Sequence, residues 1–355
     1  MKIAVYAISK NEAAFVERFC ESAREADHIV IVDTGSEDAT LDTAARIPGV
    51  STHEIAITPW RFDHARNAAL SLVPKDVDVC ISLDLDEILL PGWREEIEQL
   101  WQPATTRMSY RFDWGQGVIF YASKIHHRSG YYWYHPCHEI IYAEKRITEQ
   151  YCRTDMLLVQ HLPDQDKSRG QYLDLLRLSV SEDPNCPRNA LYFARELKFN
   201  ALWEEAIEAL QRYLAMPDAV WAPERCYAMR LLGACCHQLG KLDDARQWFF
   251  RAIAEAGWSR EPWADLASFA YAIEDWLTCH FAAQSGLKIQ DRAFLYLDDP
   301  AAWGSKLYDL GALSAFRLGL RKEAIELGTR ACEIAPDDKR LATNLGFYAE
   351  RANDA

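Results

Sequence analysis

The sequence predicts two domains, an α/β domain over residues 1–165 and an all-α domain of helical repeats over residues 166–355. Apolar runs alternate with helix-period segments over roughly the first 90 residues, and from Arg169 onward the period is almost throughout that of helices. Short aromatic strands are expected between these two regions. A chain of 355 residues is long enough to bury two cores.

The α/β domain is expected to contain a mainly parallel sheet. Strands are predicted at residues 2–8, 28–33, 50–56 and 77–83, with helices between them at residues 11–26, 41–47 and 62–72. The dense apolar run of the first strand is typical of a strand covered on both faces. This alternation favours right-handed crossovers and places ligands beyond the carboxyl ends of the strands.

Shorter strands are expected between residues 108 and 162. The candidates are SYRFDW, GVIFYAS, YYWYHPCHEIIY and DMLLVQHL, which have no long helix between them. We expect them to complete the sheet and to form a wall beside the ligand site.

The helical domain shows an internal repeat. Ala206, Ala245 and Cys279 occupy similar places in successive helix-turn-helix units, and the last two are about 34 residues apart. Residues 231–253 carry the Leu-Gly, Ala, Phe and Ala positions of a tetratricopeptide repeat, while an insertion near residues 291–303 interrupts the period. We therefore expect about four repeats that resemble the tetratricopeptide family.

The composition limits the class of function. The formal net charge of −14 argues against a protein that binds nucleic acid or anionic membranes mainly through charge. No run of about 18 apolar residues is present to span a bilayer, and the first residues do not resemble a secretory signal. The 10 cysteines are scattered without a CxxC pair, which favours reduced thiols and a cytoplasmic location.

Three carboxylates follow the fourth predicted strand. The apolar residues 77–83 run directly into Asp84, Asp86 and Glu87. If the extended conformation persists, Asp84 and Asp86 project to one side about 7 Å apart, which suits Mg²⁺ or Mn²⁺ with waters or phosphates as further ligands. Alternation then points Glu87 away from the pair. The alternative is a plain acidic junction between strand and loop, because Asp-x-Asp alone is a common pattern.

Further charged residues are expected at the same edge of the sheet. Asp33 ends the second strand before a glycine turn, and Arg66 lies just inside the helix of FDHARNAAL. An arginine at this place can bind a diphosphate through its planar fork, or it can form a surface salt bridge. A zinc site is a weaker alternative, because no recognised ligand spacing connects His126, His127, His135, Cys137 and His138.

Three segments together resemble the successive motifs of family-2 glycosyltransferases with the GT-A fold. They are AISKNEAAFVERFCESAREADHIVIVDTGSEDAT, FDHARNAAL and LDLDEIL, and their order and spacing match across residues 3–90 and more loosely to residue 162. A GT-A domain followed by tetratricopeptide-like repeats resembles a branch that includes peptide-modifying glycosyltransferases.

The resemblance implies roles for individual residues. Ile8, Asn11 and Asp33 would line the nucleotide pocket, with Asp33 contacting the base. Arg66 would lie near the diphosphate. The metal and the sugar nucleotide would be held by Asp84 and Asp86.

The chain departs from the family pattern at two places. Thr34 stands where the family often has a second aspartate. The family often carries a Glu-Asp pair with the aspartate as general base, whereas WYHPCHEII has His138 and Glu139 followed by Ile140. Inverting transfer needs a base that removes the acceptor proton. Glu139 is the first candidate and His138 the second, and if both belong to an ordinary turn the alternative is Asp113.

Other side chains have two interpretations each. His161 matches a histidine that GT-A enzymes often place after the last core strand as a metal or phosphate ligand, but it could equally be a hydrogen-bonded structural histidine. Trp114 and Trp133 could stack on a sugar or form part of a wall. Lys124 and Arg128 could add positive charge near the diphosphate or belong to a solvated hairpin.

The resemblance and the residues together predict a metal-dependent glycosyltransferase of hexosyltransferase type. Its donor would be a nucleotide-diphosphate sugar, first a UDP-sugar, and inversion is implied by the family alone. Mn²⁺ or Mg²⁺ would neutralise the departing diphosphate. The repeats are expected to bind a protein or peptide acceptor or to pair two subunits as a homodimer. The alternatives are a repeat-based binding protein with a non-catalytic GT-A domain, and a glycosyltransferase acting on modified nucleic-acid bases.

Overall fold

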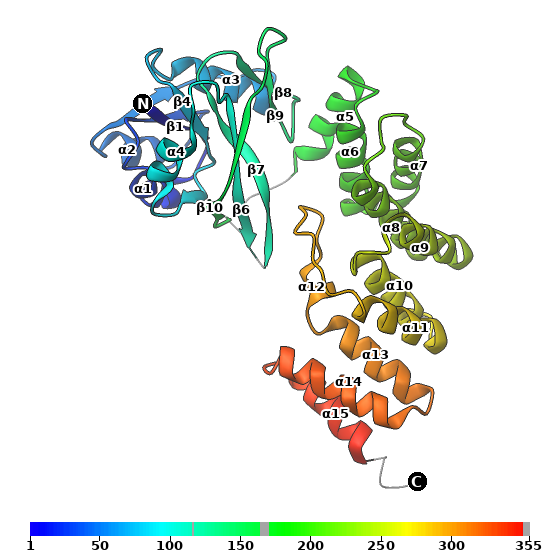
Figure 1. Ribbon diagram of the computed structural model, residues 1–355. Helices are drawn as coiled ribbons and strands as arrows, with labels where there is room; N and C mark the ends of the chain where they lie inside the picture. The colour runs from blue at the N-terminus through cyan, green and yellow to red at the C-terminus, as the bar shows by residue number, and fades with distance from the viewer. Residues whose placement is uncertain (116, 164–169, 351–355) are drawn as a thin grey trace. The chain divides into compact units, whose positions relative to one another are not determined.

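The computed structural model describes residues 1–115, 117–163 and 170–350 (Figure 1). The chain divides into two compact units, Met1–Ser179 and Val180–Ala355. The division falls within helix α5 (Tyr172–Glu182). The start of α5 belongs to the first unit because Tyr172 stacks on Phe62, with ring centroids 6.0 Å apart.

A single curved sheet forms the centre of the first unit, and among the described residues it has eight strands in the order β3-β2-β1-β4-β7-β6-β10-β5. The parallel neighbours are β3 (Val50–Glu54), β2 (His28–Asp33), β1 (Ile3–Ser9) and β4 (Val79–Ser82). The remaining strands are β7 (Val118–His127), β6 (Arg107–Gly115), β10 (Tyr151–His161) and β5 (Glu87–Leu89). The first four of these strands in sheet order pair in parallel throughout, and among the remaining strands β6 pairs with β10 in parallel. The predicted mainly parallel α/β fold is therefore confirmed.

Helices cover both faces of the parallel part of the sheet. One face packs against α1 (Ala13–Ser22), α2 (Thr40–Ala45) and α4 (Trp93–Leu100), and the other against α3 (Phe62–Leu72). Alternate residues of β1 enter the two cores, and all seven of its residues are buried. This double burial is the reason that the first strand is apolar throughout rather than alternating.

Two strands that were expected to complete the sheet form a separate ribbon. They are β8 (Tyr131–Tyr134) and β9 (Ile140–Ala143). The side chain of Asn67, on α3, accepts from the backbone N–H of Trp133 at 2.8 Å and donates to its carbonyl at 2.7 Å. An amide side chain thus takes the place of a neighbouring strand, which explains why this ribbon lies against α3.

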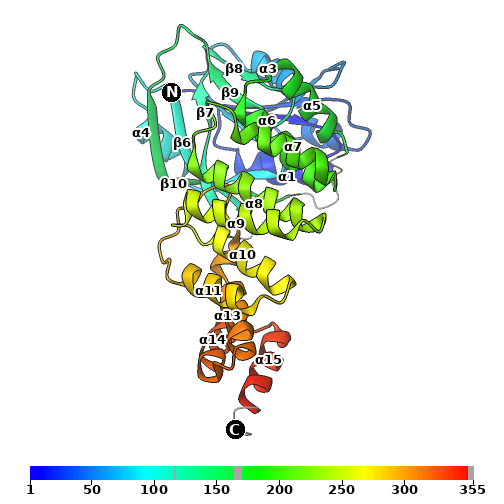
Figure 2. The same cartoon turned by 90° about the vertical axis from the view of Figure 1, so that its right-hand side faces the viewer.

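The second unit consists of helix pairs that follow one another in chain order (Figures 1 and 2). The pairs are α6 (Pro187–Phe199) with α7 (Trp203–Leu214), α8 (Ala222–Gln238) with α9 (Leu242–Ala256), α10 (Glu261–Ala272) with α11 (Trp276–Leu287), and α13 (Lys306–Arg317) with α14 (Arg321–Ile334). A further helix, α15 (Lys339–Glu350), follows the last pair, and the short α12 (Pro300–Trp303) lies in the predicted insertion. The predicted tetratricopeptide-like arrangement is confirmed.

The repeat has a simple packing cause. Ala206, Ala245 and Cys279 are each the fourth residue of the second helix of a pair, and Ala324 repeats the pattern in α14. All four are fully buried. A small side chain at this position lets the second helix approach its neighbours closely. Within the described ranges, no helix of either unit combines the length and the apolarity that crossing a bilayer requires.

Candidate active site

The acidic residues after β4 lie in a turn and not in a continued strand. β4 ends at Ser82, and the N–H of Glu87 donates to the carbonyl of Asp84 at 2.9 Å, which closes a turn at Leu85 and Asp86. The extended geometry on which the 7 Å spacing depended is therefore absent. The turn reverses the chain so that β5 starts at Glu87 and pairs with β10.

Glu87 braces this turn from within. Its carboxylate is buried and accepts from the N–H of Asp84 at 3.1 Å and from Nζ of Lys124 at 2.8 and 3.1 Å. Burial lowers the pKa of Lys124, but the charges of Glu87 and Asp84 outweigh burial and raise it, so the ammonium group stays charged. Lys124 thus supplies the positive charge that buried carboxylates require at this point.

Arg66 lies between two carboxylates that are far apart in the sequence. Its Nη2 donates to Asp84 at 2.6 Å and its Nε to Glu139, while the guanidinium lies 5.1 Å from the ring centre of Trp133. Burial would lower the pKa of Arg66, but Asp84 and Glu139 raise it well above its ordinary value. The side chain is 7% exposed, so this is a buried ion pair and not the surface salt bridge of the alternative interpretation.

The loop between β8 and β9 brings Glu139 to this place. The N–H of Phe62, the first residue of α3, donates to the carbonyl of Pro136 at 3.0 Å and fixes the loop to the helix that carries Arg66. His138 has a left-handed backbone with φ of 51°, and its ring stacks on Tyr172 with centroids 5.8 Å apart. The structure therefore brings Glu139 into contact with Arg66 and the ring of His138 into contact with Tyr172.

Asp113, the third candidate base, lies near the end of β6. Its Oδ1 accepts from the N–H of Gly115 at 2.8 Å, in the turn that leads toward β7. The neighbouring Trp114 is 47% exposed and stacks on His161 with ring centroids 4.3 Å apart. Trp114 thus covers the imidazole on one side.

Asp86 and His161 form the second group of the site. Oδ2 of Asp86 lies 3.4 Å from Nε2 of His161, and the carbonyl of Asp86 accepts from the N–H of Leu162 at 2.7 Å. Burial lowers the pKa of His161, but its contact with Asp86 and the charges of Asp86 and Glu87 raise it overall. Nδ1 of His161 is buried and has no hydrogen-bond partner among the residues that the structure describes.

This pair fits a hard divalent cation only in part. Among the described residues, no group of three His, Cys, Asp or Glu side chains is arranged to hold a metal ion. Asp86 and His161 offer one carboxylate and one imidazole side by side, and the carboxylate of Asp84 is 35% exposed nearby in the chain. Mg²⁺ and Mn²⁺ sites often need only one or two protein ligands, because waters and substrate phosphates supply the others. The donor set is compatible with such a site.

The predicted nucleotide-binding residues join two loops at the ends of β1 and β2. Oδ1 of Asp33 accepts from the N–H groups of Gly35 and Ser36, both at 2.8 Å, and Oδ2 accepts from Ser9 Oγ at 3.2 Å and from Ser36 Oγ. Asn11 has a φ of 56°, and its N–H donates to Ser36 Oγ at 2.8 Å. Ser36, which no sequence argument singled out, therefore connects the two loops, and its signal was the DTGSED turn.

Two neighbouring positions have structural contacts. Thr34, which replaces the second aspartate of the family pattern, donates through Oγ1 to the carbonyl of Ser9 at 2.9 Å. Ile8 is almost fully buried and packs in the core between β1 and α3. Its side chain therefore stabilises the core beneath this edge of the sheet.

Several residues with two interpretations prove to be structural. Trp133 is buried and donates from Nε1 to the hydroxyl of Tyr6 at 2.8 Å, and Arg128 donates to the carbonyl of Val73 at 2.9 Å. His126 is fully buried, and burial lowers its pKa to about 3. It contacts the Tyr6 hydroxyl at 3.1 Å. Lys124 alone among them joins the acidic turn.

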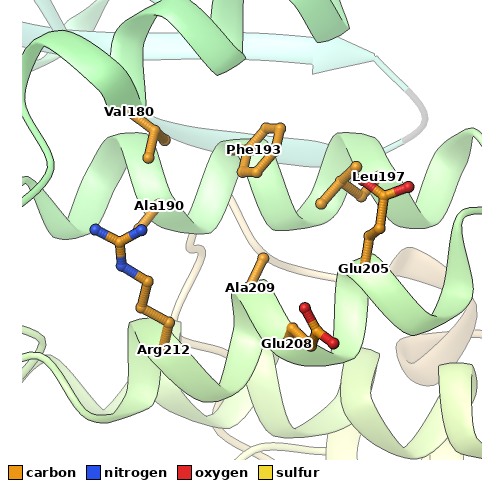
Figure 3. Close-up of a pocket in the computed structure, with 8 residues that line it drawn as sticks. All are labelled: Val180, Ala190, Phe193, Leu197, Glu205, Glu208, Ala209 and Arg212. Atoms are coloured by element: carbon orange, nitrogen blue, oxygen red, sulfur yellow. The ribbon is translucent and has the colours of Figure 1, made fainter.

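Hollows are also present in the helical unit. One of about 240 Å³ lies between α6 and α7, where Phe193, Leu197 and the aliphatic lining face Glu205, Glu208 and Arg212 (Figure 3). Another of about 560 Å³ is lined by α6, α8 and α10 and by residues of the insertion such as Tyr296. Both are lined by residues of the second unit.

Residues 5–159 match the model of the family described as "Glycosyl transferase family 2". A curated relative, an uncharacterized glycosyltransferase of Rickettsia bellii (strain RML369-C), is 30% identical over 100 residues, which are 28% of this chain and 32% of the relative. The chain therefore spans about a third of the length of that relative.

Solved structures with helical repeats are also similar to this chain. The Cut9–Hcn1 hetero-tetramer of the APC/C matches with a TM-score of 0.40 and 14% identity, over 52% of this chain and 34% of that chain. YrrB, described as a TPR protein with an unusual peptide-binding site, matches with a TM-score of 0.40 and 12% identity, over 50% and 84%. The sheet topology, the acidic turn and the family match agree for the first unit. Residues 5–159 are thus similar to family 2 glycosyltransferases, and tetratricopeptide-like helix pairs follow them in the chain.

Proposed function

We propose that this chain transfers a sugar from a nucleotide-diphosphate donor, a UDP-sugar in the first instance, to a protein or peptide acceptor with inversion at the anomeric carbon. One observation carries the proposal. The buried Arg66 pairs with the partly exposed Asp84 at the carboxyl end of β4, and Asp86 and His161 meet at the adjoining turn. Ligands of open parallel sheets bind at this edge.

Different charged groups would bind different parts of the donor. Asp86 and His161, with Asp84, would hold Mn²⁺ or Mg²⁺, and the bound cation would neutralise charge on the departing diphosphate. Arg66 supplies a planar fork of N–H donors that matches phosphate oxygens. Lys124 and Glu87 keep the acidic turn in its shape, because the Glu87 carboxylate accepts from both Lys124 Nζ and the N–H of Asp84.

The nucleotide would lie over the loops that follow β1 and β2. Asp33 and Ser36 hold the glycine turn, and Asn11 fixes the first loop to the second by accepting from the N–H of Glu37 at 2.7 Å. Contact between Asp33 and the base requires that its carboxylate exchange one of these internal hydrogen bonds for one to the ligand.

Glu139 is the proposed general base. The acceptor nucleophile forms its bond to the anomeric carbon while the bond from that carbon to the diphosphate oxygen breaks. The bonding electron pair leaves with the diphosphate, and the acceptor proton passes to a carboxylate oxygen of Glu139. Transfer from the face opposite the leaving group inverts the configuration.

Acceptor recognition is assigned to the helical unit. The hollow of about 560 Å³ presents Lys198 and His237 together with Phe269 and Tyr296, which suits a peptide that carries both polar and aromatic side chains. Pairing of two subunits through the repeats stays a prediction.

The test is binding and slow hydrolysis of UDP-glucose, UDP-galactose and UDP-N-acetylglucosamine, each with and without Mn²⁺. A true donor raises the unfolding midpoint in the presence of Mn²⁺. Asp86→Asn should abolish both effects, whereas Asp76→Asn, at an exposed ion pair of the same domain, should preserve them. Absence of binding and of hydrolysis for these UDP-sugars would leave a non-catalytic binding protein as the better interpretation.

A further inference from the structure

Arg66 contacts both the residue proposed for the donor side and the residue proposed as the base. Its Nη2 donates to Asp84 at 2.6 Å and its Nε donates to Glu139. Two carboxylates thus share one guanidinium in a site where Arg66 is 7% exposed and Glu139 is 9% exposed. Because a buried charge without a partner is costly, both carboxylates depend on the single positive charge of Arg66.

From these contacts we propose that Arg66 is a positioning residue that holds Glu139 in an ion pair until the donor binds. The diphosphate then takes over part of the guanidinium, and Glu139 is released to act on the acceptor. This inference rests on the proposed function, since it assigns the diphosphate to Arg66 and the base to Glu139. Its consequence is an order of events in which the donor binds before the acceptor is activated.

The guanidinium has capacity for a new ligand. Nη1 of Arg66 is buried and has no hydrogen-bond partner among the residues that the structure describes. A buried donor without a partner is unfavourable, and an incoming phosphate oxygen would satisfy it. A phosphate at Nη1 shares the single positive charge of the guanidinium with Glu139, which is bound at Nε, so its binding weakens the attraction between Arg66 and Glu139.

The different exposure of the two carboxylates determines which of them the incoming donor meets first. Asp84 is 35% exposed, and Glu139 is 9% exposed. The more exposed Asp84 would therefore meet a metal-diphosphate complex first. A cation held there would repel the guanidinium and favour movement of Arg66 toward the phosphates.

The frame around this exchange is fixed. Asn67, the next residue of α3, holds the backbone of Trp133 through two hydrogen bonds, and Phe62 holds the carbonyl of Pro136. The β8 strand and the loop after it are therefore attached to α3 at positions on either side of Arg66 along the helix. Only the ion pair needs to change, and the ribbon stays in place.

The affinity for UDP with Mg²⁺, measured by calorimetry on the full chain, tests the exchange. If Glu139 competes with the diphosphate for Arg66, then Glu139→Gln should bind UDP–Mg²⁺ about fivefold more tightly or better. The matched control is Glu144→Gln, which removes an exposed carboxylate paired with Arg146 at the end of the same ribbon, and it should bind as the wild type does. In an Arg66→Met background, Glu139→Gln should have no effect.

The outcomes separate the two proposals. Failure of the wild-type chain to bind UDP–Mg²⁺ contradicts the proposed function. Binding by the wild type together with unchanged or weaker binding by Glu139→Gln contradicts the exchange alone. Tighter binding that persists in the Arg66→Met background also contradicts it.

A measurement on the wild-type sequence covers the case in which a variant does not fold. The guanidinium of Arg66 lies 5.1 Å from the ring centre of Trp133. In chain labelled with 5-fluorotryptophan, the fluorine resonance of Trp133, assigned with Trp133→Phe, should shift when UDP is added with Mg²⁺ and stay in place with Mg²⁺ alone. A resonance that does not move at saturating UDP–Mg²⁺ overturns the proposal.

Discussion

Nε2 of His161 lies 3.4 Å from Oδ2 of Asp86, although His161 ends the last strand of the sheet and Asp86 lies in the turn after β4. The β5–β10 pairing creates this contact, since it places His161 opposite Glu87, the residue after Asp86. A carboxylate from a turn and an imidazole from a strand thus lie side by side.

Replacement of His161 by glutamine should weaken the Mn²⁺-dependent binding of UDP about tenfold or more, because it removes one of the few protein ligands for the cation. Isothermal titration of UDP at fixed Mn²⁺ measures the change. Gln160→Asn, the preceding position on β10, is the control and should retain the wild-type affinity. Equal affinities for His161→Gln and the wild type would assign His161 a structural role.

Replacement of Lys124 by methionine should lower the free energy of unfolding by about 3 kcal/mol, because it leaves Glu87 buried without its cation. Urea unfolding followed by circular dichroism gives the value. The double variant Lys124→Met with Glu87→Gln should recover most of this loss, since it removes the unpaired charge as well. A double variant as unstable as the single one would contradict the assigned pairing.

Stability should fall on acidification because of His126. Burial lowers the pKa of His126 to about 3 in the folded chain, from the ordinary value of 6.5. Below pH 6.5 the unfolded chain therefore binds a proton that the folded chain does not, and this contribution to stability is lost as the pH falls from 6.5 toward 3. Each pH unit in this window removes at most about 1.4 kcal/mol.

The variant His126→Asn should show a shallower loss of stability between pH 6.5 and pH 5, even if its stability at pH 7 is lower. Chemical unfolding at a series of pH values measures both slopes. His127→Asn changes the exposed neighbour and should keep the wild-type slope. Identical slopes for all three proteins would contradict the role of His126.

Two glycines of the helical unit should respond oppositely to alanine. A Cβ atom at Gly233 on α8 would lie 2.7 Å from the ring of Phe249, which is itself buried, so Gly233→Ala should cost about 1–3 kcal/mol. At Gly346 on α15 nothing lies within 4 Å of such an atom, and alanine should stabilise the helix by up to about 1 kcal/mol. Thermal unfolding compares the two, and destabilisation by Gly346→Ala would contradict this assignment.

Much of the fold follows from local pattern. The apolar run of β1 predicts a doubly covered strand because side chains on both of its faces are buried, and residues 62–72 were predicted as the helix that the structure shows as α3. β5 and α4 were missed for different reasons. The turn before β5 contains Leu85, a buried apolar residue that gives no turn signal. For α4 the sequence did contain a helix signal, namely the four-residue spacing of its two buried residues, Trp93 and Ile97.

The residues of the candidate site could be named from the sequence, but the contacts between them could not. Asp84, Arg66 and Glu139 could each be named from their place in a motif, because motif order is written in the sequence. Their shared ion pair depends on where the β8–β9 ribbon lies, and that is decided by the two hydrogen bonds of Asn67 to the backbone of Trp133. Glu87 illustrates the same limit. Strand alternation predicted only that its side chain points away from Asp84 and Asp86, and the tertiary structure was needed to show that its partner is Lys124.

The β5–β10 pairing also has a consequence for synthesis of the chain. Asp33, Ser36 and Asp86 leave the ribosome before β10, so His161 can join Asp86 only after this last strand in chain order has emerged. A nascent or truncated chain that ends before residue 161 would contain Asp86 and lack its imidazole partner. The order of translation thus delays completion of the proposed cation site until the sheet itself is finished.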